Sequence, residues 1–154
     1  MPLRIGIRID HRPWRDAVAD PRGLVRRAVR AALAVAPVPP AGSPEMAVLL
    51  ADDTLLRQLN NDYRGLDKPT NVLSFTAGDP LLLGDVAIAY ETTAAEAAAA
   101  GKPLADHLSH LVVHGTLHLL GYDHETTEDA AEMEPLEVRA LAALGIADPY
   151  QEAA

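Results

Sequence analysis

The sequence predicts a single domain over residues 1–154 in which strands and helices are mixed, in an α+β or α/β arrangement. A length of 154 residues suits one domain, and the chain has the composition of a globular protein, with 49% hydrophobic and 23% charged residues. Four segments carry strand patterns and about five carry helical ones. No internal repeat or linker divides them.

The strand predictions rest on the spacing and length of apolar runs. Residues 4–10, RIGIRID, alternate apolar and polar side chains, as in a half-buried strand. Residues 46–50, MAVLL, form the continuous apolar run of a buried strand. Further strands are predicted at 71–75 and 83–90, with a turn at Asp79 and Pro80 between them.

Helices are predicted where apolar residues recur every three or four positions behind a capping residue, several of them closed by glycine. The predicted helices run from about Pro21, behind an Asp20 cap, to Leu33; from Asp52 or Asp53 to about Asn61; from 94 to 100 behind Thr92 or Thr93; from about Pro103 to Leu120; and from about Thr127 to Leu144. The stretch from Tyr63 to Pro69 is predicted to be a polar turn.

Charge and apolar content limit the partners and the cellular context. The net charge of −9 argues against a nucleic-acid partner. Residues 1–30, however, hold eight arginines against three aspartates, which fits either a basic docking face or a merely solvated one. No apolar run approaches the roughly 20 residues that span a bilayer. The start of the sequence lacks the apolar core of a secretory signal, so we expect a cytoplasmic protein with no membrane contact.

A cluster of histidines predicts a metal site. The chain has no cysteine, so histidine and carboxylate are the only strong metal ligands it offers. His114 and His118 are four positions apart, which on a helix separates them by about 40° around the axis and about 6 Å along it. Gly121 can break the helix, and His124 then returns toward the same point. We therefore predict that His114, His118 and His124 bind one metal ion, on a helix and the turn after it.

Three neutral histidines leave a coordination position for water, which is the arrangement of catalytic rather than structural zinc sites. We expect one Zn²⁺, for which Ni²⁺ or Co²⁺ could substitute, and a bound water that supplies hydroxide near neutral pH. The same histidine spacing occurs in metzincin peptidases, where a glutamate after the first histidine is the general base. Here that position is Gly115, which disfavours a peptidase.

Two blocks of sequence resemble the YbeY family, the bacterial endoribonucleases of ribosomal RNA maturation. They are HGTLHLLGYDH at 114–124 and YRGLDKPTNVLSF at 63–75. LGDVAI at 83–88 and EME at 132–134 also fit, so the similarity runs from about residue 45 to 144. The resemblance implies an α+β fold with a mixed four-stranded sheet and the metal helix packed beside it.

The resemblance also implies an activity, which is metal-dependent cleavage of single-stranded RNA. It implies a role in 3′-end maturation of small-subunit ribosomal RNA and in ribosome quality control, with RNA and the ribosome or its accessory proteins as partners. It places the metal ligands at His114, His118 and His124 and a functional arginine at Arg64. A metallohydrolase of another class, acting on peptides or small molecules, and a ribosome-associated protein with structural zinc are the alternatives.

Three residues near the motifs have more than one interpretation. The guanidinium of Arg64 could stabilise charge on the reacting phosphate, or it could cap a turn or pair with Asp67. His110 lies one helical turn before His114 and could orient a ligand, move a proton or simply pack. Asp123 could act as a base, support a metal ligand or cap the turn.

The basic segment yields a test of RNA docking. Arg22, Arg26 and Arg30 share one helix face, so we expect replacement of all three by glutamine to weaken binding of single-stranded RNA. Each lost phosphate contact should flatten the slope of log K against log salt by about 0.7, which gives about two for the triple variant. A slope equal to that of the wild type would mean that these arginines are only solvated.

Overall fold

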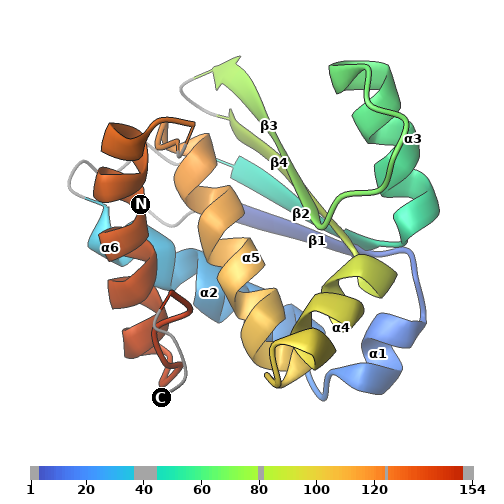
Figure 1. The fold of residues 1–154 in the computed structure, drawn as a ribbon, viewed down its shortest axis with the longest axis horizontal. Helices are drawn as coiled ribbons and strands as arrows, with labels where there is room; N and C mark the ends of the chain where they lie inside the picture. Colours follow the sequence, from blue (N-terminus) through green and yellow to red (C-terminus); the bar gives the residue numbers. More distant parts are fainter. Residues whose placement is uncertain (1–3, 37–44, 80–81, 124, 151–154) are drawn as a thin grey trace.

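The computed structural model describes residues 4–36, 45–79, 82–123 and 125–150 as a single α+β domain (Figure 1). The predicted fold class is confirmed, since a four-stranded mixed sheet is combined with six helices in the described part of the chain. The strands are β1 Arg4–Ile9, β2 Glu45–Ala51, β3 Val72–Asp79 and β4 Leu82–Ala89. The helices are α1 Pro13–Ala17, α2 Pro21–Val35, α3 Asp53–Arg64, α4 Tyr90–Ala99, α5 Leu104–Leu119 and α6 Thr127–Ala143.

The strand order in the sheet is β1-β2-β4-β3. Strand β2 is parallel to both β1 and β4, whereas β3 is antiparallel to β4. Each parallel pair is joined through helices, and β3 and β4 follow one another along the chain. Because β3 is the last strand in this order, it forms one edge of the sheet.

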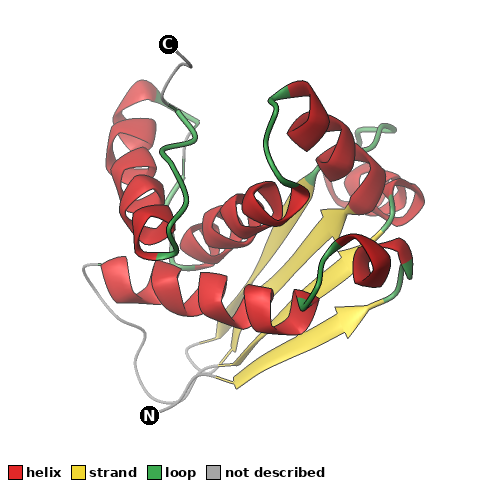
Figure 2. Ribbon diagram, turned by 90° about the horizontal axis from the view of Figure 1, so that it is seen from below, coloured by secondary structure: helices red, strands yellow, loops and turns green. Residues whose placement is uncertain are grey.

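Helices cover the two faces of the sheet unequally (Figures 1 and 2). Helices α2 and α5 pack on one face, and α6 contacts both of them. The main core lies there and includes Trp14, Val25, Leu108 and Leu141, all fully buried. The opposite face is covered by α3, which buries a smaller cluster around Leu56. The site residues on α5 thus lie on the thickly covered face, at its β3 edge.

Helix α2 confirms the predicted cap and the predicted charged face. The side chain of Asp20 accepts a hydrogen bond from the backbone N–H of Gly23 at 3.1 Å, as an N-cap should. Arg22, Arg26 and Arg30 are exposed, opposite the buried apolar residues of the same helix. The arginine-rich segment therefore presents its charge to solvent.

One helix was not predicted, and several element boundaries differ from those predicted. Helix α1 was not predicted, because five residues are too few to show a period; it forms where Trp14 is buried and donates to the carbonyl of Ala51 at 2.9 Å. Helix α3 continues through Arg64, which the sequence had placed in a turn, and ends at Gly65 in a left-handed conformation. Strand β3 extends beyond Phe75 to Asp79.

The predicted caps of α4 were wrong. The helix begins at Tyr90, directly after β4, and neither Thr92 nor Thr93 is its N-cap. The hydroxyl of Thr92 donates instead to Asp53 at 2.8 Å, and that of Thr93 donates to the carbonyl of Ala89. The hydroxyl of Thr92 is therefore used in a tertiary contact with α3, whereas that of Thr93 bonds locally to the residue just before its own helix. Within the described ranges, no helix is both long and apolar enough to cross a membrane.

Helix α5 approaches the sheet closely at Gly115. A Cβ built at this position would lie 2.7 Å from Cγ1 of Val86 on β4 and 3.3 Å from the hydroxyl of Ser74 on β3. Real Cβ atoms do not pack so closely against a branched side chain of a buried strand. Any side chain at this position would force the helix away from the sheet.

We therefore expect Gly115→Ala to lower the free energy of unfolding by about 1–3 kcal/mol through overpacking. Urea unfolding with an unchanged m-value measures this loss. Gly6→Ala is the matched control, because the nearest contact of a Cβ there would be an ordinary 3.9 Å to the carbonyl oxygen of Met46. Equal stability of the two variants would show that the helix can shift without cost.

Candidate active site

Two of the three predicted metal ligands lie together on α5. The rings of His114 and His118 have centroids 4.7 Å apart, and both side chains are partly buried. Helix α5 ends at Leu119, and Gly121 has the left-handed backbone that the predicted break needs, with φ +100°. His124 lies outside the described residues. Within the described part of the chain, no group of three metal-ligating side chains forms, so the three-histidine site stays a prediction.

Arg64 and the two histidines line the same cavity. Arg64 occupies the last turn of α3, on the other side of the sheet edge from α5. The cavity has a volume of about 370 Å³. It is lined by Arg64, Thr70, Asn71, Val72, Ser74, His114, His118, Asp123 and Glu125. The cavity thus brings together the arginine of one sequence motif and two histidines of the other.

The alternative in which Arg64 pairs with Asp67 is not what the structure contains. Asp67 accepts two hydrogen bonds from Arg57, at 2.7 and 3.2 Å. The Arg57 guanidinium also holds the pKa of the Asp67 carboxyl below its usual value. Arg57 therefore neutralises Asp67, and Arg64 remains a cation on the wall of the cavity.

Asp123 has a structural contact as well as a place in the cavity. Its Oδ1 accepts a hydrogen bond from the backbone N–H of Glu125 at 3.3 Å, which fits the turn-capping interpretation. Its side chain also lines the cavity with His114 and His118. A role as base or as support for a metal ligand stays a prediction.

A buried glutamate on α6 contacts the histidines from behind, and sequence reasoning missed it. Glu137 is fully buried. Its Oε1 lies 2.7 Å from Nδ1 of His114, and its Oε2 lies 2.8 Å from Nε2 of His110. The hydroxyl of Tyr150 donates to Oε2 as well. A signal was present, because Glu137 occupies the apolar face of α6 with Met133.

The contacts of Glu137 keep it ionised. Burial alone would raise its pKa, but the hydrogen bonds from His110 and His114 outweigh burial and lower the pKa to about 2. An ionised carboxylate only accepts hydrogen bonds, so the ring nitrogens facing it carry hydrogens. Burial and the neighbouring Glu137 raise the pKa of Tyr150, which therefore remains a neutral donor.

His110 lies beside His114 and contacts Glu137. Its ring is 6.4 Å from that of His114, centroid to centroid, and its Nε2 contacts Glu137. His110 and His114 thus contact the same carboxylate, and whether His110 orients a ligand, moves a proton or only packs stays a prediction. His107, one turn earlier, lies 3.0 Å from Glu96 through its Nε2.

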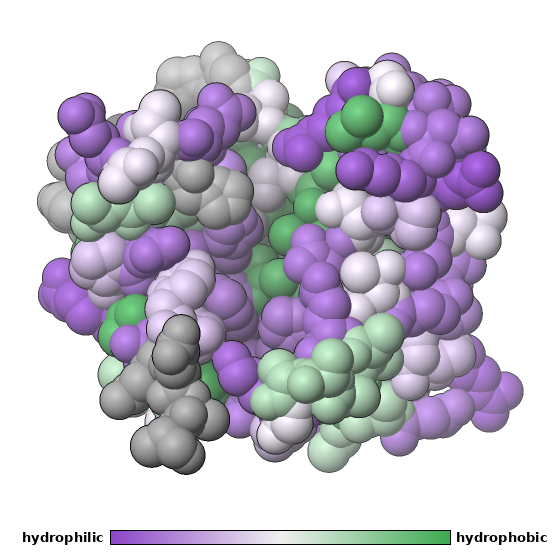
Figure 3. All heavy atoms as spheres, viewed as in Figure 1, coloured by the Kyte–Doolittle hydropathy of each residue, from purple (hydrophilic) through white to green (hydrophobic). Residues whose placement is uncertain are grey.

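A second cavity adjoins the first along α5. It has a volume of about 660 Å³ and shares Asn71, Val72 and His114 with the first. The space-filling view shows a hollow down the middle of this face, with hydrophobic residues at its floor and hydrophilic residues on both sides (Figure 3). A chain molecule of several repeating units could therefore lie along the two cavities and pass over His114.

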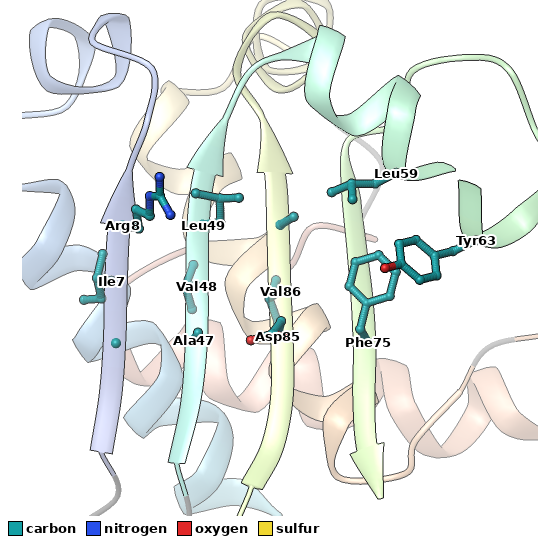
Figure 4. Close-up of a pocket in the computed structure, with 12 residues that line it drawn as sticks. Ile7, Arg8, Ala47, Val48, Leu49, Leu59, Tyr63, Phe75, Asp85 and Val86 are labelled. Atoms are coloured by element: carbon teal, nitrogen blue, oxygen red, sulfur yellow. The ribbon is translucent and has the colours of Figure 1, made fainter. Parts of the chain in front are cut away.

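Another large cavity lies on the α3 face of the sheet (Figure 4). It has a volume of about 590 Å³, and its lining is mostly apolar, with Tyr63 and Phe75 packed together 5.1 Å apart. Neither the histidines of α5 nor Arg64 lines it. Arg8 and Asp85 do line it, but Arg64, His114 and His118 all line the other cavity, at the β3 edge.

Comparison with known proteins shows which family this chain is similar to. A family model described as Endoribonuclease YbeY matches residues 11–145. A protein of Paramagnetospirillum magneticum with that name is 51% identical over 160 residues, covering 97% of this chain and 97% of the relative. One from Rhodospirillum rubrum, also named Endoribonuclease YbeY, is 49% identical over 167 residues, covering 99% of this chain and 84% of the relative.

A solved structure shares the fold. A solution structure from Thermotoga maritima superposes with a TM-score of 0.56 and covers 96% of this chain and 99% of its own. The sequence identity is 21%, so this likeness concerns the fold alone.

Proposed function

The chain belongs to the YbeY endoribonuclease family, and we propose that it is a metal-dependent hydrolase that cleaves single-stranded RNA. The observation that carries the proposal is the cavity in which Arg64 lies with His114 and His118. A cation beside two adjacent imidazoles suits a phosphodiester, whose reacting centre gains negative charge.

The described residues fit a zinc-class ion. Adjacent imidazoles four positions apart on a helix can share an ion, and a carboxylate behind one of them is the usual support of a metal-ligating histidine. His114 and His118 would hold the ion, with His124 as the third ligand that the sequence predicts. Such an ion supplies Lewis-acid chemistry that activates water for attack on phosphorus.

The side chains of the cavity have distinct proposed tasks. Arg64 would bind two phosphate oxygens at once and stabilise their charge during cleavage. Asp123, within the same cavity, is the candidate proton acceptor. The hollow that continues past His114 would position the strand on either side of the scissile bond.

The alternative of a metzincin-like peptidase is disfavoured by packing as well as by sequence. The position that carries the peptidase's general base is Gly115, and a Cβ there would meet Val86. The base could not be restored without moving α5 off the sheet. A small-molecule hydrolase remains the second class that the cavity could serve.

We further propose that the substrate is small-subunit ribosomal RNA, with cleavage in 3′-end maturation and ribosome quality control in the cytoplasm. The relatives are named endoribonucleases, and the overall charge of −9 is unfavourable for free RNA. The ribosome or an accessory protein would therefore supply the docking that charge does not.

Metal removal tests the first part of this proposal. We expect about one zinc-class ion per purified chain, held by ring nitrogens at about 2.0–2.1 Å. His118→Ala should abolish that stoichiometry while circular dichroism of the fold is retained. Elemental analysis after dialysis measures both proteins, and full metal occupancy in the variant would exclude His118 as a ligand. RNA cleavage should be lost with a chelator and return with zinc, whereas a structural zinc protein would show no cleavage in either state.

Arg64 tests the phosphate assignment. We expect Arg64→Ala to lower the rate of RNA cleavage by about 10²–10³, as the loss of a donor to transition-state charge does. Arg64→Lys should recover only part of this loss, because an ammonium lacks the bidentate geometry. Arg57→Ala is the matched control on the same helix, since its guanidinium pairs with Asp67. Metal content should be unchanged in all three, and a wild-type rate in Arg64→Ala would remove Arg64 from the site.

A further inference from the structure

Glu137 is the one fully buried side chain among the described residues that carries a charge. An ionised carboxylate removed from water costs several kcal/mol unless hydrogen bonds replace its hydration. Here three donors replace it: His110, His114 and Tyr150. The donors come from α5 and from the segment after α6, so the contact is tertiary in origin.

The two oxygens of Glu137 have different partners. Oε1 accepts from Nδ1 of His114, whereas Oε2 accepts from both His110 and Tyr150. Two donors on Oε2 fix the plane of the carboxylate and thereby aim Oε1 at a single atom of His114. Because a carboxylate cannot donate, Nδ1 of His114 must carry the hydrogen, and in the neutral ring the lone pair is then on Nε2.

From this geometry we propose that Glu137 is a positioning residue that fixes the tautomer and the ring orientation of His114, and that Tyr150 locks Glu137 in place. The lone pair of Nε2 is what a metal ion would require of this histidine. The consequence for metal affinity rests on the proposed function, whereas the tautomer of His114 does not.

Tyr150 reaches Glu137 through a folded-back segment. After α6 ends, the backbone N–H of Ile146 donates to the carbonyl of Leu141 at 2.9 Å, which turns the chain. Asp148 then accepts the backbone N–H of Tyr150 at 2.8 Å. The ring of Tyr150 packs edge-on against that of His110, with centroids 5.7 Å apart. The last described residues thus contact Glu137 and His110, although they lie outside the sequence motifs that contain the histidines.

Two isosteric substitutions separate this role from packing. Glu137→Gln keeps the shape but leaves a single acceptor oxygen, so one histidine must face an amide that donates. Tyr150→Phe removes only the hydroxyl. Glu132→Gln is the matched control, because it removes an exposed carboxylate of the same helix that lines neither cavity beside His114. All three variants are compared with the wild type in the metal-free and the zinc-titrated state.

The first measurement is the tautomer of His114 in metal-free protein, from nitrogen–proton correlation spectra of the imidazole. We expect Nδ1–H in the wild type and in Glu132→Gln, and a loss of this single tautomer in Glu137→Gln. The second is zinc affinity, by competition with a chromogenic chelator. We expect a 10–100-fold loss for Glu137→Gln, a smaller loss for Tyr150→Phe and none for Glu132→Gln.

The outcomes are distinguishable. Wild-type tautomer and wild-type zinc affinity in both Glu137→Gln and Tyr150→Phe would overturn the proposal. If Glu137→Gln does not fold, Tyr150→Phe decides, since it alters a half-exposed residue and leaves the buried carboxylate. A wild-type protein that bound no zinc would overturn the proposed metal function, while the tautomer would still show whether Glu137 positions His114.

Discussion

The close contact of α5 with the sheet at Gly115 sets where the candidate site residues lie. With no side chain at this position, the helix packs onto Val86 and the neighbouring strand at a distance that a Cβ would not permit. His114 and His118 then lie along the edge of this contact, beside β3 and within reach of the cavity that Arg64 also lines. If the helix lay further from the sheet, the imidazoles would be separated from the guanidinium and the three side chains would no longer line one cavity.

Helix α6 also depends on the position of α5, through the contacts of Glu137. Its buried Glu137 is tolerable only because α5 presents two ring nitrogens to it, and those rings in turn are held by the carboxylate. The packing of α6 and the position of the His114 ring therefore depend on each other. This coupling explains why an ionised side chain occupies the apolar face of a helix whose other buried residues are ordinary core.

Local charge matters more than net charge in this protein. The chain is acidic overall, yet Arg64 stands on the cavity wall while Arg57 neutralises the nearby Asp67. The exposed arginines of α2 lie on a separate surface. An anionic strand in the cavity would thus meet one cation beside the candidate ligands. Such a distribution favours binding in one register over general adhesion to nucleic acid.

The sequence by itself determined the fold class, most helices and strands, and the spacing of His114 and His118, because these follow from local periodicity, caps and breakers. Only the tertiary structure decided that Arg64 belongs to a helix and shares a cavity with those histidines, that Glu137 contacts His114, and that Thr92 bonds to Asp53 instead of capping α4. Local rules describe a residue's neighbours along the chain. Which distant side chains meet depends on how helices pack against the sheet, and a buried carboxylate acquires its meaning only from the donors that packing brings to it.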